Sequence, residues 1–322
     1  MEHRPLNDDG ARTMRGLWFA FLDGMEPSIS GLHGYALKLT GNVWDAEDLV
    51  QDTLLRGFAM VARGDFHGPD SPVRDARAYL FRTATNLWID RVRQARRLVP
   101  GDPEEAPSAP QGDAVEVGEA VAQVAGQTSA REFAALVLKE ACDFTLAEIA
   151  DFLGTTPGTV KSLLSRGRGR LRNTAAVDHP RAMDRRLVDG FVAALNAGDA
   201  DRVMALMAES VKIDVCNVGG GRGRRGIWTA RTLARSRFEA AVVDGWPLAL
   251  MFPADGAELC GALRFESDAG LVVRIIDYTY APETLDYVAA QLGLPAQHRG
   301  RHQVDELPDM IATTTLPWQT FR

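Results

Sequence analysis

Apolar side chains recur at helical spacing through the first hundred residues. The spacing predicts one helix near 18–39, a second from Asp45, whose side chain suits an N-cap, to about Val61, and a third over 75–97. The third helix has an apolar side that we expect in a core, formed by Leu80, Ala84, Leu87 and Trp88. These patterns predict an all-α region over residues 16–97.

Two short helices around a tight turn are predicted over residues 145–172. Thr145 and Glu148 have the spacing of a capping box, Gly154 is typical of a left-handed helix end, and Pro157 suits the first position of the next helix. That second helix carries a lysine and four arginines and no acid. A cationic helix held by a partner helix is how a helix-turn-helix enters the DNA major groove. The pattern therefore favours DNA binding over its alternative, a solvated basic face.

The pattern changes after about residue 182. An amphipathic helix over 183–195 and a short helix over 201–208 precede strand-like runs at 211–215, 248–252, 258–265 and 271–280. Helices followed by a curved antiparallel sheet predict an α+β cone.

Composition is that of an ordinary globular protein of two or three domains, with 322 residues, 46% hydrophobic and 25% charged. No apolar run has the roughly 18 residues of a membrane span, and the first residues are not typical of a signal peptide. Cys142, Cys216 and Cys260 lack metal-type spacing. We expect reduced thiols, a cytoplasmic protein, no membrane association and no metal.

The net charge of −7 means that any DNA contact must come from local basic patches. Residues 74–97 carry seven arginines against two acids, interleaved with Tyr79, Phe81 and Trp88. Aromatic faces beside cations suit single-stranded nucleic acid, and Asn86 is hard to explain as core. Residues 98–119 are proline-rich and acidic, which predicts a flexible linker.

Two stretches, DAEDLVQDTLLRGF (45–58) and RAYLFRTATNLWIDRVRQARR (77–97), precede the linker and the helix-turn-helix. In this order they resemble the extracytoplasmic-function sigma factors, minimal bacterial sigma-70 relatives with regions 2 and 4 only. The resemblance implies a region 2 helical bundle over 16–97, the linker over 98–119 and region 4 over 120–174. It also implies core RNA polymerase and promoter DNA as partners.

The same resemblance implies roles for individual residues. Helix 45–58 would dock on core polymerase through Asp45, Asp48, Leu49, Gln51, Asp52 and Arg56. Helix 77–97 would read and melt the −10 element through Arg82, Asn86, Asp90, Arg91 and Arg93. The last helix would read the −35 element through Thr156, Thr159, Lys161, Ser162, Ser165, Arg166 and Arg168. The family commonly has an arginine where this chain has Leu163.

The third region has a resemblance of its own. Its opening, AALNAGDADRVMALMAESV, resembles SnoaL-like domains of the NTF2-like superfamily, and APETLDYVAAQLGLP (281–295) resembles the helix that closes such domains when they are fused to sigma factors. Because no histidine lies between His179 and His298, we interpret the domain over 182–292 as regulatory, followed by a tail over 293–322. A small-molecule ligand in this domain is left open. The stretch 217–228 predicts a surface loop that contacts the sigma core or DNA, a regulatory loop of Gly219, Gly220, Gly221, Arg222 and Arg224.

Three functions follow from these observations. The leading one is a sigma factor that directs transcription initiation, with activity modulated by its fused domain. The second is a stand-alone, ligand-sensing helix-turn-helix regulator, and the third is an enzyme that uses Asp214 or Tyr278 in the cone. The leading function needs no catalytic residue and no cofactor.

Overall fold

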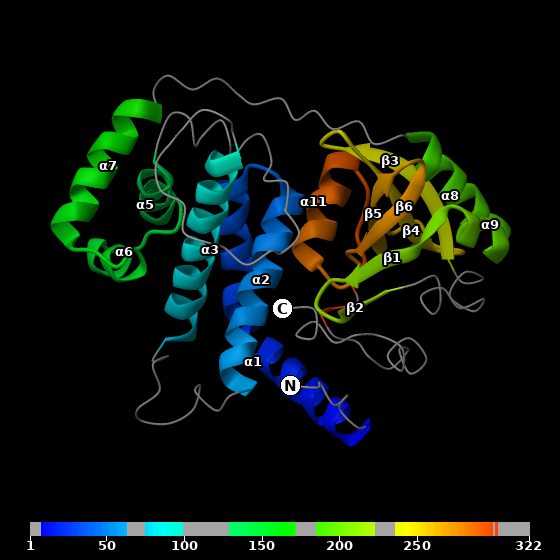
Figure 1. Cartoon of the computed structure of the whole chain (residues 1–322), viewed down its shortest axis with the longest axis horizontal. Helices are drawn as coiled ribbons and strands as arrows, with labels where there is room; N and C mark the ends of the chain where they lie inside the picture. Colours follow the sequence, from blue (N-terminus) through cyan, green and yellow to red (C-terminus); the bar gives the residue numbers. More distant parts are fainter. Residues whose placement is uncertain are drawn as a thin grey trace. The chain divides into compact units, whose positions relative to one another are not determined.

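The computed structural model describes residues 8–62, 75–98, 129–171, 185–222, 236–298 and 300–301. The chain divides into two compact units, Met1–Asp178 and His179–Arg322, and each is described by itself (Figure 1).

The first unit is all-α. Its described helices are α1 (Asp8–Thr40), α2 (Val43–Ala62), α3 (Ala76–Leu98), α5 (Ala130–Glu140), α6 (Leu146–Phe152) and α7 (Pro157–Leu171). The three helices predicted before residue 98 are confirmed, although α1 begins about ten residues earlier than expected. Figure 1 shows α3 with α1 and α2 on one side and with α5 and α6 on the other.

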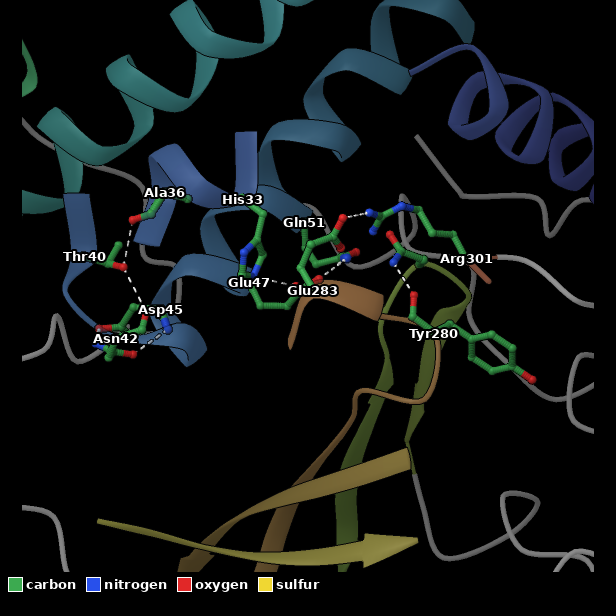
Figure 2. A network of polar contacts seen from close by, with 11 residues as sticks. His33, Ala36, Thr40, Asn42, Asp45, Glu47, Gln51, Tyr280, Glu283 and Arg301 are labelled. Carbon is green, nitrogen blue, oxygen red and sulfur yellow. Dashed lines mark hydrogen bonds and ion pairs between the residues drawn. The ribbon is translucent and has the colours of Figure 1, made fainter. Parts of the chain in front are cut away.

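The start of α2 corrects one prediction. Asn42, rather than Asp45, caps this helix, because its side-chain oxygen accepts a hydrogen bond from the Asp45 backbone N–H at 2.8 Å. The Asn42 amide also donates to the Asp45 carboxylate at 2.7 Å, as Figure 2 shows. Asp45 is therefore held as part of the cap.

The core of the helical bundle is aromatic. Trp18, Phe21 and Phe58 pack together near one end, with Trp18 edge-on to Phe58 at 5.1 Å. Tyr35 and Thr85 share a buried hydrogen bond of 2.7 Å between α1 and α3. Burial raises the pKa of the Tyr35 phenol, so it stays neutral. The predicted apolar side of α3 is buried and so confirmed, at Leu80, Ala84, Leu87 and Trp88.

The helix-turn-helix forms as its sequence predicts. Thr145 and Glu148 complete a capping box at the start of α6, and Gly154 has a left-handed φ of 58° after its end. Behind α7, a side chain added at Gly167 would lie 2.6 Å from a methyl carbon of Leu136 on α5. The missing side chain therefore permits the close approach of α5 and α7.

The second unit is α+β, as predicted. It consists of α8 (Arg185–Ala197), α9 (Ala200–Ala205), β1 (Met207–Val215), β2 (Gly219–Arg222), β3 (Ser236–Val243), β4 (Trp246–Pro253), β5 (Gly261–Asp268), β6 (Leu271–Asp277) and α11 (Pro282–Leu292). The strands form one sheet in the order β2-β1-β6-β5-β4-β3.

The sheet is mixed, which corrects the prediction of an antiparallel one. β1 runs parallel to β6, whereas the other neighbours are antiparallel. Parallel neighbours need a long connection, and the strands between β1 and β6 in the chain provide it. Helix α8 buries Leu187, Phe191 and Leu195 against the sheet, with Phe191 4.8 Å from Phe265 on β5.

Contacts at two turns hold the second unit together. Asn196, at the end of α8, exchanges two hydrogen bonds of 2.8 Å with the Phe238 backbone on β3. Asn217, in the turn after β1, donates at 2.6 Å to the Tyr280 carbonyl that precedes α11 (Figure 2). Arg301 pairs with Glu283 on α11, so the chain beyond the helix is held against it.

Candidate functional sites

Helix α3 carries an exposed polar stripe. Arg82, Asn86, Asp90 and Arg93 follow one another at intervals of three or four residues and so share one face. Asn86, Asp90 and Arg93 are exposed, and Arg82 is half-exposed. Arg93 pairs with Asp90 at 3.5 Å, which leaves the Asn86 amide as the uncharged donor and acceptor at the centre of the stripe. We call these four residues the α3 stripe.

Arg91 does not belong to this stripe, which corrects its assignment to the DNA-reading set. Its guanidinium pairs with the Asp52 carboxylate and also donates to the Asp48 carbonyl at 3.3 Å, both on α2. Burial raises the pKa of the Asp52 carboxyl, and the adjacent Arg91 opposes that rise. Arg91 therefore fastens α3 to α2 instead of facing outward.

The aromatic residues of α3 also differ from expectation. Phe81 and Trp88 are 1% exposed, so in this conformation neither offers a face on which a base can stack. Tyr79 is half-buried, with the Arg82 guanidinium 5.8 Å from its ring centre. The prediction of an interleaved stacking surface is therefore wrong for Phe81, whereas the burial of Trp88 agrees with its predicted place on the apolar side of the helix.

The exposed side of α2 is polar. Arg56 is exposed, and Asp45, Asp48, Gln51 and Asp52 are partly exposed. Gln51 donates at 2.8 Å to Glu47, whose carboxylate lies 3.5 Å from the imidazole of His33 on α1 (Figure 2). Leu49 was expected among the polymerase contacts, but it is fully buried in the bundle. Leu49 is thus withdrawn from that set.

On α7 the predicted DNA-reading residues divide into two groups. Thr156, Thr159, Lys161, Ser162 and Ser165 are exposed, and the hydroxyls of Thr156 and Thr159 lie 3.0 Å apart at the start of the helix. Leu163, where the family commonly has arginine, is buried with the apolar side of the helix. The outward face near the start of α7 is therefore made of hydroxyls and one lysine.

The second group is tied to α5. Arg166 donates at 2.8 Å to Glu132, a buried acid that also caps its own helix, and Arg168 pairs with the exposed Glu140. These ion pairs hold the α7 cations against the helix behind them. The side chains of Arg96 and Arg97 on α3 and of Arg170 on α7 lie outside the described residues, as does all of Arg172.

A hollow of about 620 Å³ lies along the inner edge of α7. Lys139 on α5 and Lys161 and Arg168 on α7 line it, together with Leu146, Leu164, Ser165 and Gly169. Arg168 is already paired with Glu140, and the positive charge of Lys139 and Lys161 suits the negative charge of a phosphate group.

In the second unit, two predictions change. The backbone of Gly219–Arg222 forms the edge strand β2 instead of a loop, while the side chain of Arg222 and all of Arg224 lie outside the described residues. Asp214 and Glu266 both bind Arg274 on β6, at 2.7 and 3.2 Å. Asp214 also pairs with Lys212 at 3.3 Å and Glu266 with Arg264 at 3.6 Å, so both acids are compensated by cations and do not resemble an acid–base pair.

Two features are absent from the part of the chain that the structure describes. No described helix has the length and apolar character needed to cross a membrane. Within those same ranges, no cluster of three or more histidine, cysteine or acidic residues has metal-binding geometry.

Comparison with known proteins assigns the first unit. Residues 28–98 match the Sigma-70 region 2 family, and residues 126–171 match the Sigma-70 region 4 family. The ECF RNA polymerase sigma factor SigL of Mycobacterium tuberculosis is 39% identical over 137 residues, covering 40% of this chain and 74% of SigL.

Two further similarities extend into the second unit. The ECF RNA polymerase sigma factor SigG of M. tuberculosis is 29% identical over 274 residues, covering 70% of this chain and 72% of SigG. A solved NTF2-like protein of unknown function from Cytophaga hutchinsonii is 12% identical, covering 31% of this chain and 91% of that protein, with a TM-score of 0.23. The chain belongs to the extracytoplasmic-function family of RNA polymerase sigma factors, which bind core polymerase and promoter DNA to direct transcription initiation and are not enzymes.

Proposed function

We propose that the chain initiates transcription through three separate surfaces and that its fused domain modulates this activity in the cytoplasm. Region 2 spans 16–97, the linker 98–119, region 4 120–174, the SnoaL-like domain 182–292 and the tail 293–322. The exposed side of α2 docks on core polymerase, the α3 stripe reads the −10 element, and the start of α7 reads the −35 element.

The exposed Asn86 on α3 carries this proposal. Promoter melting removes bases from the stack at a cost of a few kcal/mol per step, and a site that hydrogen-bonds an extruded base offsets part of it. An asparagine amide offers both donors and an acceptor to a base edge. Asn86 is exposed between half-exposed Arg82 and exposed Arg93, so it can meet a base while neighbouring cations meet phosphates.

At the −35 element, we propose that hydroxyls read the bases and that Lys161 contacts a phosphate. The first turns of a recognition helix contact base edges, and here those turns present Thr156, Thr159 and Ser162. Arg166 and Arg168 are held by acids of α5, so we assign them to orienting α7 and to phosphate contacts.

For the second unit we propose a regulatory role. Its described strand carboxylates Asp214 and Glu266 share Arg274, which favours regulation over acid–base catalysis. The segment 219–224 is kept as its regulatory element, now built on an edge strand whose outer backbone groups can pair with another chain. Binding of a small molecule there stays a prediction.

Run-off transcription with core polymerase tests the whole proposal. The full chain should initiate at a defined promoter, and a fragment of residues 1–178 should choose the same start site with altered output. Loss of initiation by the full chain would refute the sigma assignment. A change of promoter in the fragment would refute the regulatory role of the second unit.

A charge reversal tests the α2 surface. Asp48→Arg should weaken core polymerase binding about tenfold, because an acid on the docking side is replaced by a cation. Asp23→Arg on α1, at an exposed position outside the proposed surface, serves as the matched control. Equal effects of both variants would remove α2 from the interface.

A further inference from the structure

The hollow beside α7 brings together side chains from three helices, and we call it the α7 hollow. Lys139 comes from the end of α5, Leu146 from the start of α6, and Lys161 and Ser165 from α7. Leu164, also on α7, is buried and gives the hollow an apolar wall. The volume of about 620 Å³ leaves room for a phosphate group and the atoms bonded to it.

Lys139 is held in place at the edge of this hollow. Its side chain is half-buried, and its ammonium donates at 3.2 Å to the carbonyl of Phe144 in the turn before α6. An ammonium has three N–H donors, so this bond leaves others for a ligand. A side chain that is already ordered loses less conformational entropy when it binds. Lys139 is therefore better prepared to bind an anion than a lysine that extends into solvent.

Two acids lie close to these cations, and both are already bound. Glu140 pairs with Arg168. Glu148, which lies near Lys139, accepts hydrogen bonds from the Thr145 backbone at 2.7 Å and from the Thr145 hydroxyl at 2.6 Å. Over the ranges that the structure describes, Lys161 has no acid within ion-pair distance. Three cations against two acids leave the hollow with a net positive charge.

The α7 hollow lies beside the residues proposed to read bases. Lys161, Ser165 and Arg168 recur at intervals of four and three residues and so share one side of α7, next to the side that carries Thr159 and Ser162. A helix with its side chains is about 10–12 Å across, and the major groove is about 12 Å wide. A helix that directs one side at base edges therefore has its flanks against the sugar–phosphate backbones.

We propose that the α7 hollow is a phosphate-binding site and that Lys139, outside the helix-turn-helix, binds the phosphate together with Lys161. The position of the hollow favours a backbone phosphate of the promoter duplex. A free phosphorylated compound has the same chemistry and is the other possible source. For the DNA source, the inference deepens the proposed role of region 4 and rests on it. A backbone contact of Lys139 fixes the position of α7 on the duplex without reading sequence.

Salt dependence of promoter binding tests this role of Lys139. The full chain with core polymerase is titrated against a promoter duplex over a range of salt concentrations. Lys139→Gln should weaken binding about threefold at about 0.1 M salt for all −35 sequences and reduce the slope of log affinity against log salt by about 1. Lys139→Arg keeps the charge and should restore most of both losses.

Lys38→Gln is the matched control. Lys38 is an exposed lysine on α1 that does not line the α7 hollow, and its substitution removes the same charge from the chain. Affinity and slope should stay at the wild-type values. An equal fall in slope for Lys38→Gln and Lys139→Gln would show that net charge matters and that the hollow is not a site.

Inorganic pyrophosphate distinguishes the two sources of phosphate. It is titrated into the full chain by calorimetry at constant ionic strength. Binding to the wild type that Lys139→Gln abolishes, with displacement of the duplex, would assign the hollow to free phosphorylated compounds. A reduced salt slope without pyrophosphate binding would assign it to the DNA backbone alone. Both results support a phosphate site.

The inference and the proposed function fail in different ways. An unchanged slope for Lys139→Gln, together with no pyrophosphate binding that depends on Lys139, would overturn the phosphate site and leave the proposed function intact. A wild-type complex that does not bind a promoter duplex would refute the proposed function. The pyrophosphate titration would still decide whether the hollow binds phosphate.

Discussion

Helices α3 and α7 are both rich in arginine, yet they hold their cations in different ways. On α3, Arg91 turns inward to α2, while Arg93 stays on the surface beside Asp90. On α7, Arg166 and Arg168 both reach back to acids of α5. The outward face of α3 therefore has charged side chains on both sides of the Asn86 amide, whereas the start of α7 presents hydroxyls and one lysine.

This difference shows that a count of cations does not give the number available to DNA. An arginine paired with a protein acid releases no counterion from DNA until that pair breaks. The arginines that are paired with protein acids have different structural roles on the two helices. Arg91 joins α3 to α2 within region 2, and Arg166 joins α7 to α5. Variants at arginines paired with protein acids, compared with variants at exposed side chains, test this distinction.

The largest effect is expected at Arg91. Arg91→Ala should lower the free energy of unfolding by about 2 kcal/mol, because it leaves a partly buried Asp52 without its cation. Polymerase and promoter binding should weaken together. Arg93→Ala, at an exposed position, should change stability by less than about 0.5 kcal/mol in the same thermal or denaturant titration.

The Arg91→Ala defect should depend on pH. Burial already raises the pKa of Asp52, and loss of Arg91 removes the influence that opposes this rise. A carboxyl with a raised pKa favours the folded state when protonated, and that contribution is lost as pH rises through the folded pKa. The gap between wild type and variant should therefore narrow as pH falls from about 7 toward about 4. A gap that widens on acidification would contradict the assigned role of Arg91.

Asn86→Ala should have the next largest effect, on promoter opening alone. Loss of a base-reading amide should slow opening about 10- to 100-fold, as measured by reactivity of unpaired thymines, with polymerase affinity unchanged. Gln94→Ala truncates another exposed amide two turns further along α3 and should cost much less. Equal loss of opening and polymerase binding would show that Asn86 does not face a base.

Arg166→Ala should destabilise region 4 by about 1 kcal/mol. The change removes a cation from the buried carboxylate of Glu132, which keeps its cap hydrogen bond from the Ser129 backbone N–H. Arg168→Ala is the matched control, because its partner Glu140 is exposed and such pairs contribute little. Similar unfolding midpoints for the two variants would show that the Glu132 pair is no more important than a surface pair.

The smallest effect is expected at Lys161. Lys161→Ala should weaken duplex binding about threefold for all −35 sequences and reduce the slope of log affinity against log salt by about 1. A loss confined to one base position would show that Lys161 reads sequence instead of phosphate. That result would place Lys161 among the residues that read base sequence.

Much of this architecture could be predicted from local patterns. Thr145 with Glu148, Gly154 and Pro157 define the helix-turn-helix because capping and turn chemistry depend on neighbouring residues. The apolar side of α3 follows from helical spacing in the same way. For the second unit, helix α8 and the strand-like runs were enough to predict an α+β fold.

The rest depended on tertiary contacts that no local pattern contains. The spacing of Arg91 does not show that Asp52 lies opposite it, and Leu49 and Phe81 needed a packed bundle to be recognised as interior. Strand β3 was missed because its sequence, SRFEAAVV, alternates poorly. The parallel pairing of β1 with β6 links segments far apart in the chain.

Gly167 has a consequence for how promoter preference can change over time. A Cβ at position 167 would lie 2.6 Å from the Leu136 side chain and 3.4 Å from the Glu132 carbonyl, so a larger residue there must displace Leu136 or shift α7 against its support. A shift of α7 would change the bases that we propose for Thr159 and Ser162, although neither residue had been altered. A lineage could thus acquire a new set of target genes through a position that never touches nucleic acid.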